Sequence, residues 1–258
     1  MSNIDLTSWG RSLVASLQEL EEKKISSNTN LINYYVNSVV GNDENDGLTI
    51  ETPFKTIQHA IDILPKCLKY SAIIHLAEGE YPEDVRIENF FGGSTLAIRG
   101  NIVGDDSSAL LEGAEAYKVN SIVINACKTG ITLSGINVIG QNETYTSAIS
   151  VLSSPIVQIW RCRTENASNF GIYANYSSHI YAANCLISNK ISSAFYALFG
   201  AIIEAHDPTG TLNKRVLYVY RGGVIRTTVA TTKIQNMGET AFQVAEGGVI
   251  TNISGQSV

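Results

Sequence analysis

The feature that most constrains the fold is a skeleton of small and aliphatic residues that repeats about every 23 positions. The segment GIYANYSSHIYAANCLISNK begins at Gly171, and the segments one period before and after it keep apolar residues in the same slots while most polar residues change. Three such columns run through the second half of the chain. They are Ile149, Ile172, Phe195, Leu217 and Phe242; Val151, Ala174, Ala197, Val219 and Val244; and Val157, Ile180, Ile203, Ile225 and Ile250.

A period of this length, with two or three short strands in each unit, indicates a β-solenoid whose coils stack ~4.8 Å apart. Inward residues must stay apolar because each packs on its equivalents in the neighbouring coils, whereas outward residues and turns can vary. Looser repeats from Ser71 onward bring the count to about eight coils. We expect Cys162 to stack on Cys185, and Asn166 on Asn189, because both pairs are separated by one period.

An N-terminal helix is predicted in residues 1–30, because apolar residues recur at helical spacing between Asp5 and Lys24. They are Leu6, Trp9, Leu13, Leu17 and Leu20. We expect this helix to serve oligomerisation or attachment.

Residues 31–70 are predicted to hold a first strand, a loop rich in Gly, Asn and Asp, and a capping helix. The helix should run from Pro53 to Leu64, with Thr52 as its N-cap and Pro65 as its stop. One apolar face and a place just before the strands predict that it covers an open end of the solenoid, which is expected to occupy residues 71–258.

The segments YYVNSVVGNDENDGLT and TPFKTIQHAID, with the coils that follow, resemble the N-terminal module of right-handed parallel β-helix proteins of the pectate-lyase-like family. This module occurs in phage tailspikes and tail appendages and in some polysaccharide lyases. The resemblance covers most of the chain from Tyr34 and is specific for fold rather than chemistry. It implies a right-handed, all-β parallel β-helix with a capping helix, and a preceding helical segment that mediates trimer formation or attachment.

Composition and charge exclude several classes of partner. A net charge of −6, without a Lys/Arg cluster, argues against binding to nucleic acid or to an anionic membrane surface. No apolar run approaches the ~18 residues of a membrane span, and the N-terminus lacks the pattern of a signal peptide. We therefore expect the protein to stay in a cytoplasm or to leave it without cleavage. The four cysteines lack metal-site or disulfide-scaffold spacing and are interpreted as buried apolar residues.

The acidic residues give only weak candidates for a metal site. A pectate-lyase-like enzyme would need carboxylates of adjacent coils around calcium, which takes six to eight oxygen ligands. No column of the coils carries three carboxylates. Asp43 and Asp46 of the first loop are the weak candidates for calcium, and turn formation explains them first. No other cofactor is predicted.

Glu204 and Asp207, in the segment IIEAHDPTG, are the weak candidates for the two carboxyl groups of a glycoside hydrolase. The register of the repeat, however, places Glu204 beside Arg226 of the next coil and Tyr181 of the previous one. A cross-strand salt bridge is therefore the preferred interpretation. The sequence contains no Ser-His-Asp order, phosphate loop or zinc pattern, and no catalytic residue is predicted.

Tyrosines provide the candidate binding surface. Strand alternation turns Tyr173, Tyr196 and Tyr218 outward, one above another, with Tyr181 and Tyr220 nearby. A flat ring with a hydroxyl suits the face of a sugar, and equally a neighbouring subunit. We interpret these residues as a contact surface for one of the two.

Together these observations predict a structural or receptor-binding component of a phage tail. It would be a homotrimer that contacts host cell-surface polysaccharide and binds other tail or virion proteins through its N-terminal helix. Two alternatives remain: a polysaccharide lyase or glycoside hydrolase on the same fold, and a bacterial surface adhesin. The expected location is the virion tail after assembly in the host cytoplasm, or the bacterial cell surface for the adhesin.

Overall fold

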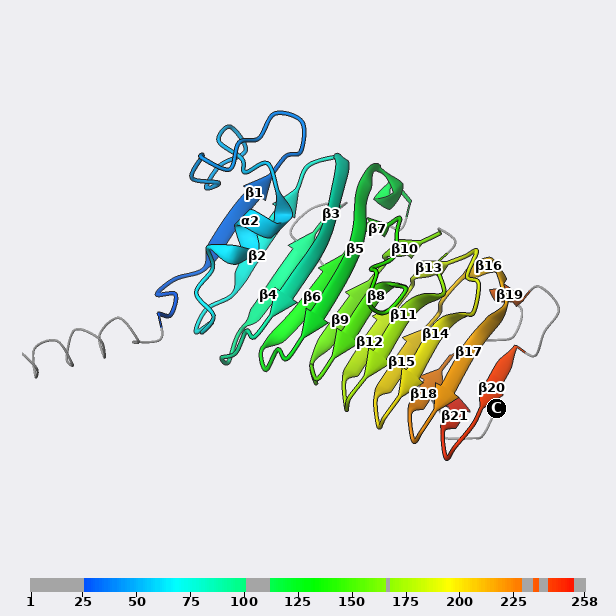
Figure 1. The fold of residues 1–258 in the computed structure, drawn as a ribbon. Helices are drawn as coiled ribbons and strands as arrows, with labels where there is room; N and C mark the ends of the chain where they lie inside the picture. The colour runs from blue at the N-terminus through cyan, green and yellow to red at the C-terminus, as the bar shows by residue number, and fades with distance from the viewer. Residues whose placement is uncertain (1–25, 101–111, 166–167, 229–233, 237–240, 253–258) are drawn as a thin grey trace, which may run out of the picture.

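The structure is a computed structural model that describes residues 26–100, 112–165, 168–228, 234–236 and 241–252. The predicted helix between Asp5 and Lys24, and Asn166 of the predicted asparagine pair, lie outside the described residues. Within them the chain forms an all-β solenoid in which every described strand pairing is parallel. Successive turns stack along one axis from the blue to the red end of the chain (Figure 1).

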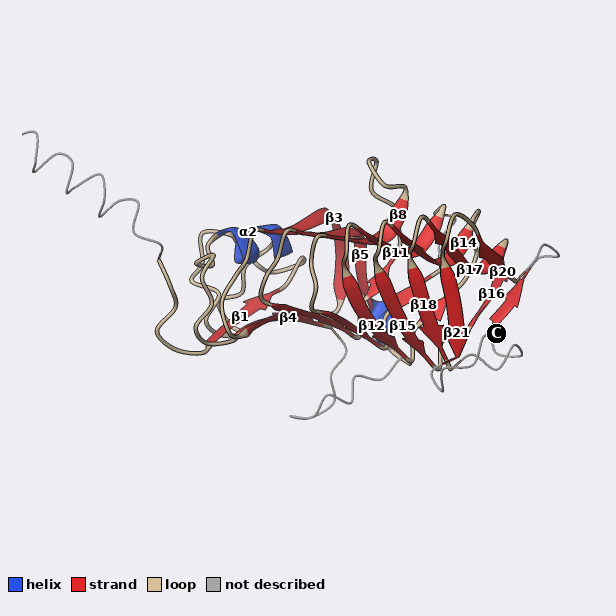
Figure 2. Cartoon of the chain, turned by 90° about the horizontal axis from the view of Figure 1, so that it is seen from below, coloured by secondary structure: helices blue, strands red, loops and turns tan. Residues whose placement is uncertain are grey.

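Two large sheets form the walls of the solenoid, and Figure 2 shows them as separate layers. The nine-stranded sheet contains, in order, β1 (Ile32–Val36), β2 (Ala72–Leu76), β4 (Thr95–Arg99), β6 (Gly130–Ser134), β9 (Val157–Trp160), β12 (His179–Ala183), β15 (Ile202–His206), β18 (Val224–Thr227) and β21 (Val249–Asn252).

The ten-stranded sheet contains most of the remaining strands. It contains β13 (Leu186–Ile187), β10 (Arg163–Thr164), β7 (Asn137–Val138), β5 (Tyr117–Asn125), β8 (Ser147–Leu152), β11 (Phe170–Asn175), β14 (Ser193–Leu198), β17 (Arg215–Tyr220) and β20 (Phe242–Val244), with β3 (Gly79–Glu88) paired to β5. A small sheet joins β16 (Gly210–Asn213) to β19 (Ile234–Asn236).

About six turns, those that begin at β4, β6, β9, β12, β15 and β18, contribute a strand to the continuous path of both large sheets. This is fewer than the predicted eight. The difference arises partly at the N-terminal end, where the chain between β1 and β2 forms a loop and a short helix instead of a sheet strand.

The three apolar columns stack in the predicted register. Ile172 lies between Ile149 and Phe195, and the other two columns pair in the same way from turn to turn. Except for Val244, side chains of these columns belong to, or pack against, one continuous core along the solenoid. Val244 lies in the last described strand of its sheet and is 52% exposed, so the inward prediction was wrong at this position. Because each of these core side chains packs on the equivalent residue of the neighbouring turns, the same apolar pattern recurs from turn to turn.

The cysteines are free thiols, as their spacing predicts, and three of the four are buried. Cys162 and Cys185 immediately precede residues that pair between β10 and β13, so they lie in neighbouring turns. Burial raises the pKa of the Cys185 thiol to about 12 and also raises that of Cys162. Both thiols are therefore protonated and act as small apolar groups at neutral pH.

The capping helix is shorter than predicted. Helix α2 spans only Ile57–Asp62, and its N-cap is Thr56 rather than Thr52. Phe54 is extended, because its N–H donates to the Tyr35 carbonyl at 2.9 Å and the residue forms a parallel bridge with Val36. The prediction of a helix from Pro53 was wrong because this pairing with β1 competes with the first helical turn. The other helix described, η1, is a single 3₁₀ turn at Ala114–Ala116.

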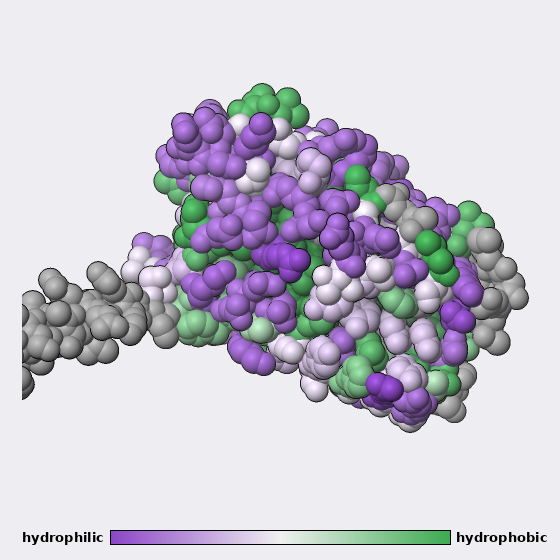
Figure 3. Space-filling model, in the orientation of Figure 1, coloured by the Kyte–Doolittle hydropathy of each residue, from purple (hydrophilic) through white to green (hydrophobic). Residues whose placement is uncertain are grey.

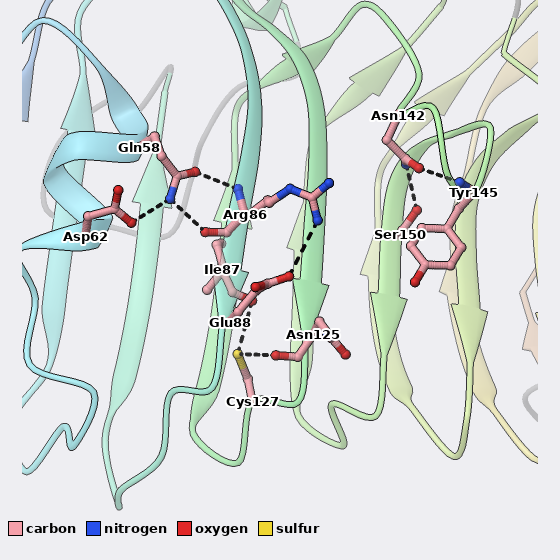
Figure 4. Close-up of polar contacts among 10 residues, drawn as sticks. All are labelled: Gln58, Asp62, Arg86, Ile87, Glu88, Asn125, Cys127, Asn142, Tyr145 and Ser150. Atoms are coloured by element: carbon pink, nitrogen blue, oxygen red, sulfur yellow. Dashed lines mark hydrogen bonds and ion pairs between the residues drawn. The ribbon is translucent and has the colours of Figure 1, made fainter.

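Two contacts attach α2 to the first turns. The Glu83 carboxylate accepts from the N–H groups of Ile57 and Gln58 at 3.0 and 2.9 Å, at the positive end of the helix dipole. Figure 4 shows the second contact, in which the Gln58 side chain exchanges hydrogen bonds with the backbone of Arg86 and also donates to Asp62. Among the described residues, no helix is long and apolar enough to span a membrane.

We expect Ile180→Asp to destabilise the fold by roughly 3 to 5 kcal/mol, because it places a carboxylate without a partner in the fully buried third column. Gln158→Asp, at an exposed position of the neighbouring strand β9, is the matched control and should change stability little. Thermal unfolding followed by circular dichroism measures both. Equal melting temperatures for Ile180→Asp and the unchanged protein would contradict the inward assignment.

Candidate functional site

The outer face of the ten-stranded sheet carries the predicted tyrosine ladder, which we define as Tyr173, Tyr196 and Tyr218. These residues occupy equivalent positions of β11, β14 and β17 and pair directly in the parallel register. In the space-filling view, pale atoms of intermediate hydropathy gather over these turns, while the N-terminal part of the same face is mostly hydrophilic (Figure 3).

One end of the ladder is covered rather than open. Tyr173 is only 8% exposed, because the rings of Tyr145 and Phe170 stack against it with centroids 5.7 and 5.9 Å away. With Val123, Leu152 and Leu198, it forms a second, smaller apolar cluster on the outside of the sheet. Tyr173 therefore lies on the outer face of the sheet, as strand alternation predicts, but its ring is covered by the chain itself.

Asn142 holds the covering loop in place. Its Nδ2 donates to the Ser147 carbonyl at 2.8 Å. Figure 4 shows its bonds to two further partners, in which Nδ2 donates to Ser150 Oγ at 2.9 Å and Oδ1 accepts from the Tyr145 N–H at 2.6 Å. Asn142 and Ser150 are both buried. Because the amide satisfies several polar groups at once, it fixes the loop that brings the Tyr145 ring over Tyr173.

The other end of the ladder is half-buried and accessible. The rings of Tyr196 and Tyr218 are nearly parallel, with centroids 4.5 Å apart and an interplanar angle of 8°. The Arg215 guanidinium lies 5.6 Å from the centre of the Tyr218 ring. Tyr220 follows in the same strand, and its hydroxyl donates to the Glu246 carboxylate at 2.6 Å. We call Tyr196 and Tyr218, together with the neighbouring Tyr220, the open end of the ladder.

The hydroxyls of Tyr173 and Tyr196 stay neutral over a wide pH range. Burial raises the pKa of Tyr173 to about 12, and burial together with Tyr218 raises that of Tyr196 to about 12. A neutral phenol both donates and accepts hydrogen bonds. At the accessible Tyr196 the ladder therefore offers an apolar ring with a neutral hydroxyl at its edge.

Tyr181 lies away from the ladder, on β12 of the nine-stranded sheet. Its ring contacts Trp160 and His206, with centroids 5.0 and 4.4 Å away. Sequence reasoning placed it near the ladder because the repeat alone does not say which strands share a wall. Tyr181 thus belongs to a separate aromatic group on the second face.

Glu204 forms the predicted cross-strand pair. It lies in register with Tyr181 and Arg226, and its Oε1 is 3.0 Å from Arg226 Nη1 and 3.3 Å from His179 Nε2. Asp207 lies in the turn after β15, with a φ of 43°, and its N–H donates to Thr228 Oγ1. These contacts fit a salt bridge and a turn, and catalytic roles for the pair have no geometric support.

Asp43 and Asp46 fold the first loop. The Asp43 carboxylate accepts from the N–H groups of Lys55 and Thr56 and from Thr56 Oγ1, all within 2.9 Å. Asp46 accepts from the Leu48 N–H and from Thr52 Oγ1, and the bond from the Thr52 hydroxyl lowers the pKa of Asp46. The described residues contain no group of three or more His, Cys, Asp or Glu suited to a metal ion. Turn formation accounts for both aspartates.

Sequence reasoning missed an aromatic rim beside the ladder. Tyr176 and Phe199 stack with centroids 5.7 Å apart at 10°, and they are 55% and 38% exposed. Arg221 continues the rim, with its guanidinium 5.2 Å from the centre of the Phe199 ring, and bonds to Glu246 at 2.9 Å. Tyr176 and Phe199 are one period apart, so the repeat itself carried the signal that could have found them.

The rim stands on tight corners where the backbone is left-handed. Tyr176, Phe199, Arg221 and Glu246 have φ values of 52°, 49°, 46° and 48°, and the last three precede glycines that also have positive φ. Turns with positive φ at both central residues favour Asn or Gly at the first position. Bulky side chains there are therefore not explained by the turn.

A buried lysine was also missed. Lys190 is 2% exposed, and burial lowers its pKa to about 7, although the Glu165 carboxylate acts in the opposite direction. Its N–H donates to the Asn213 side chain, which is itself buried. The pair Asn189–Lys190 reads in sequence as an exposed turn, so no local signal could have found it.

Comparisons with known proteins identify a family. A model of the family described as "Protein of unknown function (DUF1565)" matches residues 39–236. Nothing matches the chain among curated proteins. Among solved structures, a selenomethionine derivative of the GH136 lacto-N-biosidase from Eubacterium ramulus is similar, at 12% identity and a TM-score of 0.25, over 92% of this chain and 70% of that one. A likeness at that TM-score carries no argument about activity.

The raised tyrosine pKa values predict a loss of stability at alkaline pH. Below about pH 10, the ordinary pKa of tyrosine, folded and unfolded chains are both protonated and the stabilising contribution is fully present. As the pH rises toward about 12, the unfolded state loses its protons first, so stability falls. Tyr173→Phe removes one of these groups and should make the fall shallower.

Urea unfolding between about pH 8 and pH 11.5 measures this effect. Tyr70→Phe, at an exposed tyrosine, is the control and should leave the pH dependence unchanged. Identical pH profiles for Tyr173→Phe and the unchanged protein would show that the Tyr173 hydroxyl titrates normally.

Proposed function

The chain belongs to the DUF1565 family of proteins of unknown function, and we propose that it is a glycan-binding β-helix whose contact surface is the open end of the tyrosine ladder. The observation that carries the proposal is the pair of half-buried, nearly parallel rings of Tyr196 and Tyr218 on the wall of a rigid solenoid. The faces of the Tyr196 ring stack on Tyr218 and Phe170, so the edges of the rings and their hydroxyls are what a ligand meets. Ring edges held in a fixed orientation contact the apolar C–H groups of a pyranose, and the hydroxyls bond to sugar hydroxyls.

The surroundings of the open end favour a sugar over a neighbouring subunit. The apolar part of the cluster is already covered by Tyr145 and Phe170, so a partner meets mainly ring edges and polar groups. Arg215, Arg221 and Glu246 border the rings and supply hydrogen-bond donors and acceptors. A stable subunit interface usually has a larger, more apolar centre.

The setting that we propose is a phage tail appendage. It would be a homotrimer that binds host cell-surface polysaccharide and attaches to other tail or virion proteins through the N-terminal residues. The resemblance of residues 34–62 to the N-terminal module of tailspikes supports this setting. In this setting the protein, a right-handed β-helix, is assembled in the host cytoplasm and becomes part of the virion. A bacterial surface adhesin would use the same chemistry at the cell surface.

A polysaccharide lyase or glycoside hydrolase is the second candidate. The observation in its favour is the acidic Glu204 next to Tyr181 on the nine-stranded sheet, close to the Trp160 and His206 rings. The pairing of Glu204 with Arg226 weighs against it, because a carboxylate held by an arginine is a poor proton donor. We therefore place this activity second.

Tyr196→Ala and Tyr218→Ala should each weaken binding to the host polysaccharide by roughly tenfold, about 1.4 kcal/mol, because each removes a ring that contacts sugar. Adsorption to host cells and to their extracted polysaccharide measures binding, and analytical ultracentrifugation measures assembly. Tyr70→Ala is the matched control, since Tyr70 is exposed and lies about 100 positions before the ladder in the sequence. Unchanged adsorption with weaker assembly would assign the ladder to a subunit interface and refute the glycan site.

Glu204→Gln should not change the rate of any polysaccharide cleavage. It should lower the free energy of unfolding by only about a few tenths of a kcal/mol, because it weakens an ion pair near the surface. Reducing-end and unsaturated-product assays on the extracted polysaccharide measure cleavage. Cleavage by the unchanged protein that disappears in a folded Glu204→Gln variant would establish the enzyme instead.

A further inference from the structure

A cavity of about 410 Å³ lies at the N-terminal end of the nine-stranded sheet, away from the tyrosine ladder. The first loop forms one side of it through Ile50 and Pro53, and the strands form the other. Its volume falls within the range of small-molecule sites. No residue of the tyrosine ladder or of the aromatic rim lines it.

Three successive turns supply one wall. Tyr35 of β1, His75 of β2 and Arg99 of β4 occupy the same position in the parallel register, so their side chains form a row. They face outward, because the residues that precede or follow them, such as Val36 and Ile98, are buried in the core. The Tyr35 and His75 rings stack with centroids 5.0 Å apart and an interplanar angle of 17°.

The opposite wall is fixed before any ligand arrives. The Pro53 carbonyl accepts from the Asn42 N–H and from Asn45 Nδ2, and the Gly47 N–H donates to the Thr52 carbonyl. Asp43 and Asp46 add the bonds described above. A loop held by this many hydrogen bonds loses little conformational entropy when a ligand binds, which favours affinity.

The charge of the cavity comes from one residue. No Asp or Glu is among its described lining residues, and Arg99 is their single guanidinium. Its side chain forms no ion pair or hydrogen bond with a described residue. His75 bonds to Asn33 Oδ1, and burial, followed by the charge of Arg99, lowers its pKa, so it is neutral at physiological pH. In a chain of net charge −6, a half-buried arginine that pairs with no carboxylate of the described residues is a site for an outside anion.

We propose that this cavity binds a monosaccharide-sized ligand with one anionic group, a carboxylate or a phosphate, which pairs with the Arg99 guanidinium while the ring lies between Tyr35 and the Ile50–Pro53 wall. Two parallel hydrogen bonds from arginine suit either anion. This site is independent of the glycan surface proposed above, because no residue is shared between them.

Isothermal titration of the full chain with glucuronate, glucose 6-phosphate and glucose tests the proposal. We expect glucuronate or glucose 6-phosphate to bind and glucose not to bind. Arg99→Gln should weaken binding by roughly tenfold to a hundredfold, the loss typical of a hydrogen-bonded charge pair. Ile50→Asp, at a 70% exposed position of the cavity wall, should also weaken binding because it places a carboxylate beside the anion.

Arg86→Gln is the matched control. It removes one positive charge from the ten-stranded sheet, so it should leave binding unchanged if the effect comes from the cavity rather than from net charge. Binding of glucuronate alone would identify a sugar acid, and binding of glucose 6-phosphate alone a sugar phosphate; both support the site. Equal binding of glucose, equal loss with Arg86→Gln, or no binding of the three probes at millimolar concentration would overturn it.

Discussion

The fold depends on one constraint: every inward side chain must pack on the side chain at the same position of the turn before and after it. Parallel strands ~4.8 Å apart leave no freedom in this contact, because a shift of one residue would turn a whole strand inside out. The columns through Ile172, Ala174 and Ile180 keep this register over five successive positions each, and their members are buried except in the last described strand, β20. Everything on the outer surface is arranged around that fixed core.

The same constraint explains why the end of the solenoid must be covered by a different structure. At the N-terminal end, the first turn has no earlier turn to stack on, and the chain between β1 and β2 covers it with α2. Long-range polar contacts hold that cover, since Asp43 and Glu83 accept hydrogen bonds from the backbone at the start of the helix. Those contacts also fix the loop that lines the cavity, so the cap and the cavity share one scaffold.

Periodic packing was predictable from the sequence, and contacts outside the period were not. The register that pairs Glu204 with Arg226 followed directly from the repeat. The start of α2 did not, because it depends on Asp43, which lies more than ten positions earlier in the chain. The covering of Tyr173 depends on the Asn142 loop, which belongs to one turn only. The row of Tyr35, His75 and Arg99 was hidden because the inserted loop and helix separate its first two members by about 40 positions.

The left-handed corners have a consequence for recognition. Their side chains project from one edge of the solenoid, off the pleat of both sheets, so each can change without altering the strands. Along this edge the chemistry changes in one direction, from the rings of Tyr176 and Phe199 to the ion pair of Arg221 and Glu246. An elongated molecule that lies along the edge therefore meets apolar rings at one end and opposite charges at the other. The edge thus has a polarity, and a linear polymer placed along it would make different contacts in its two directions.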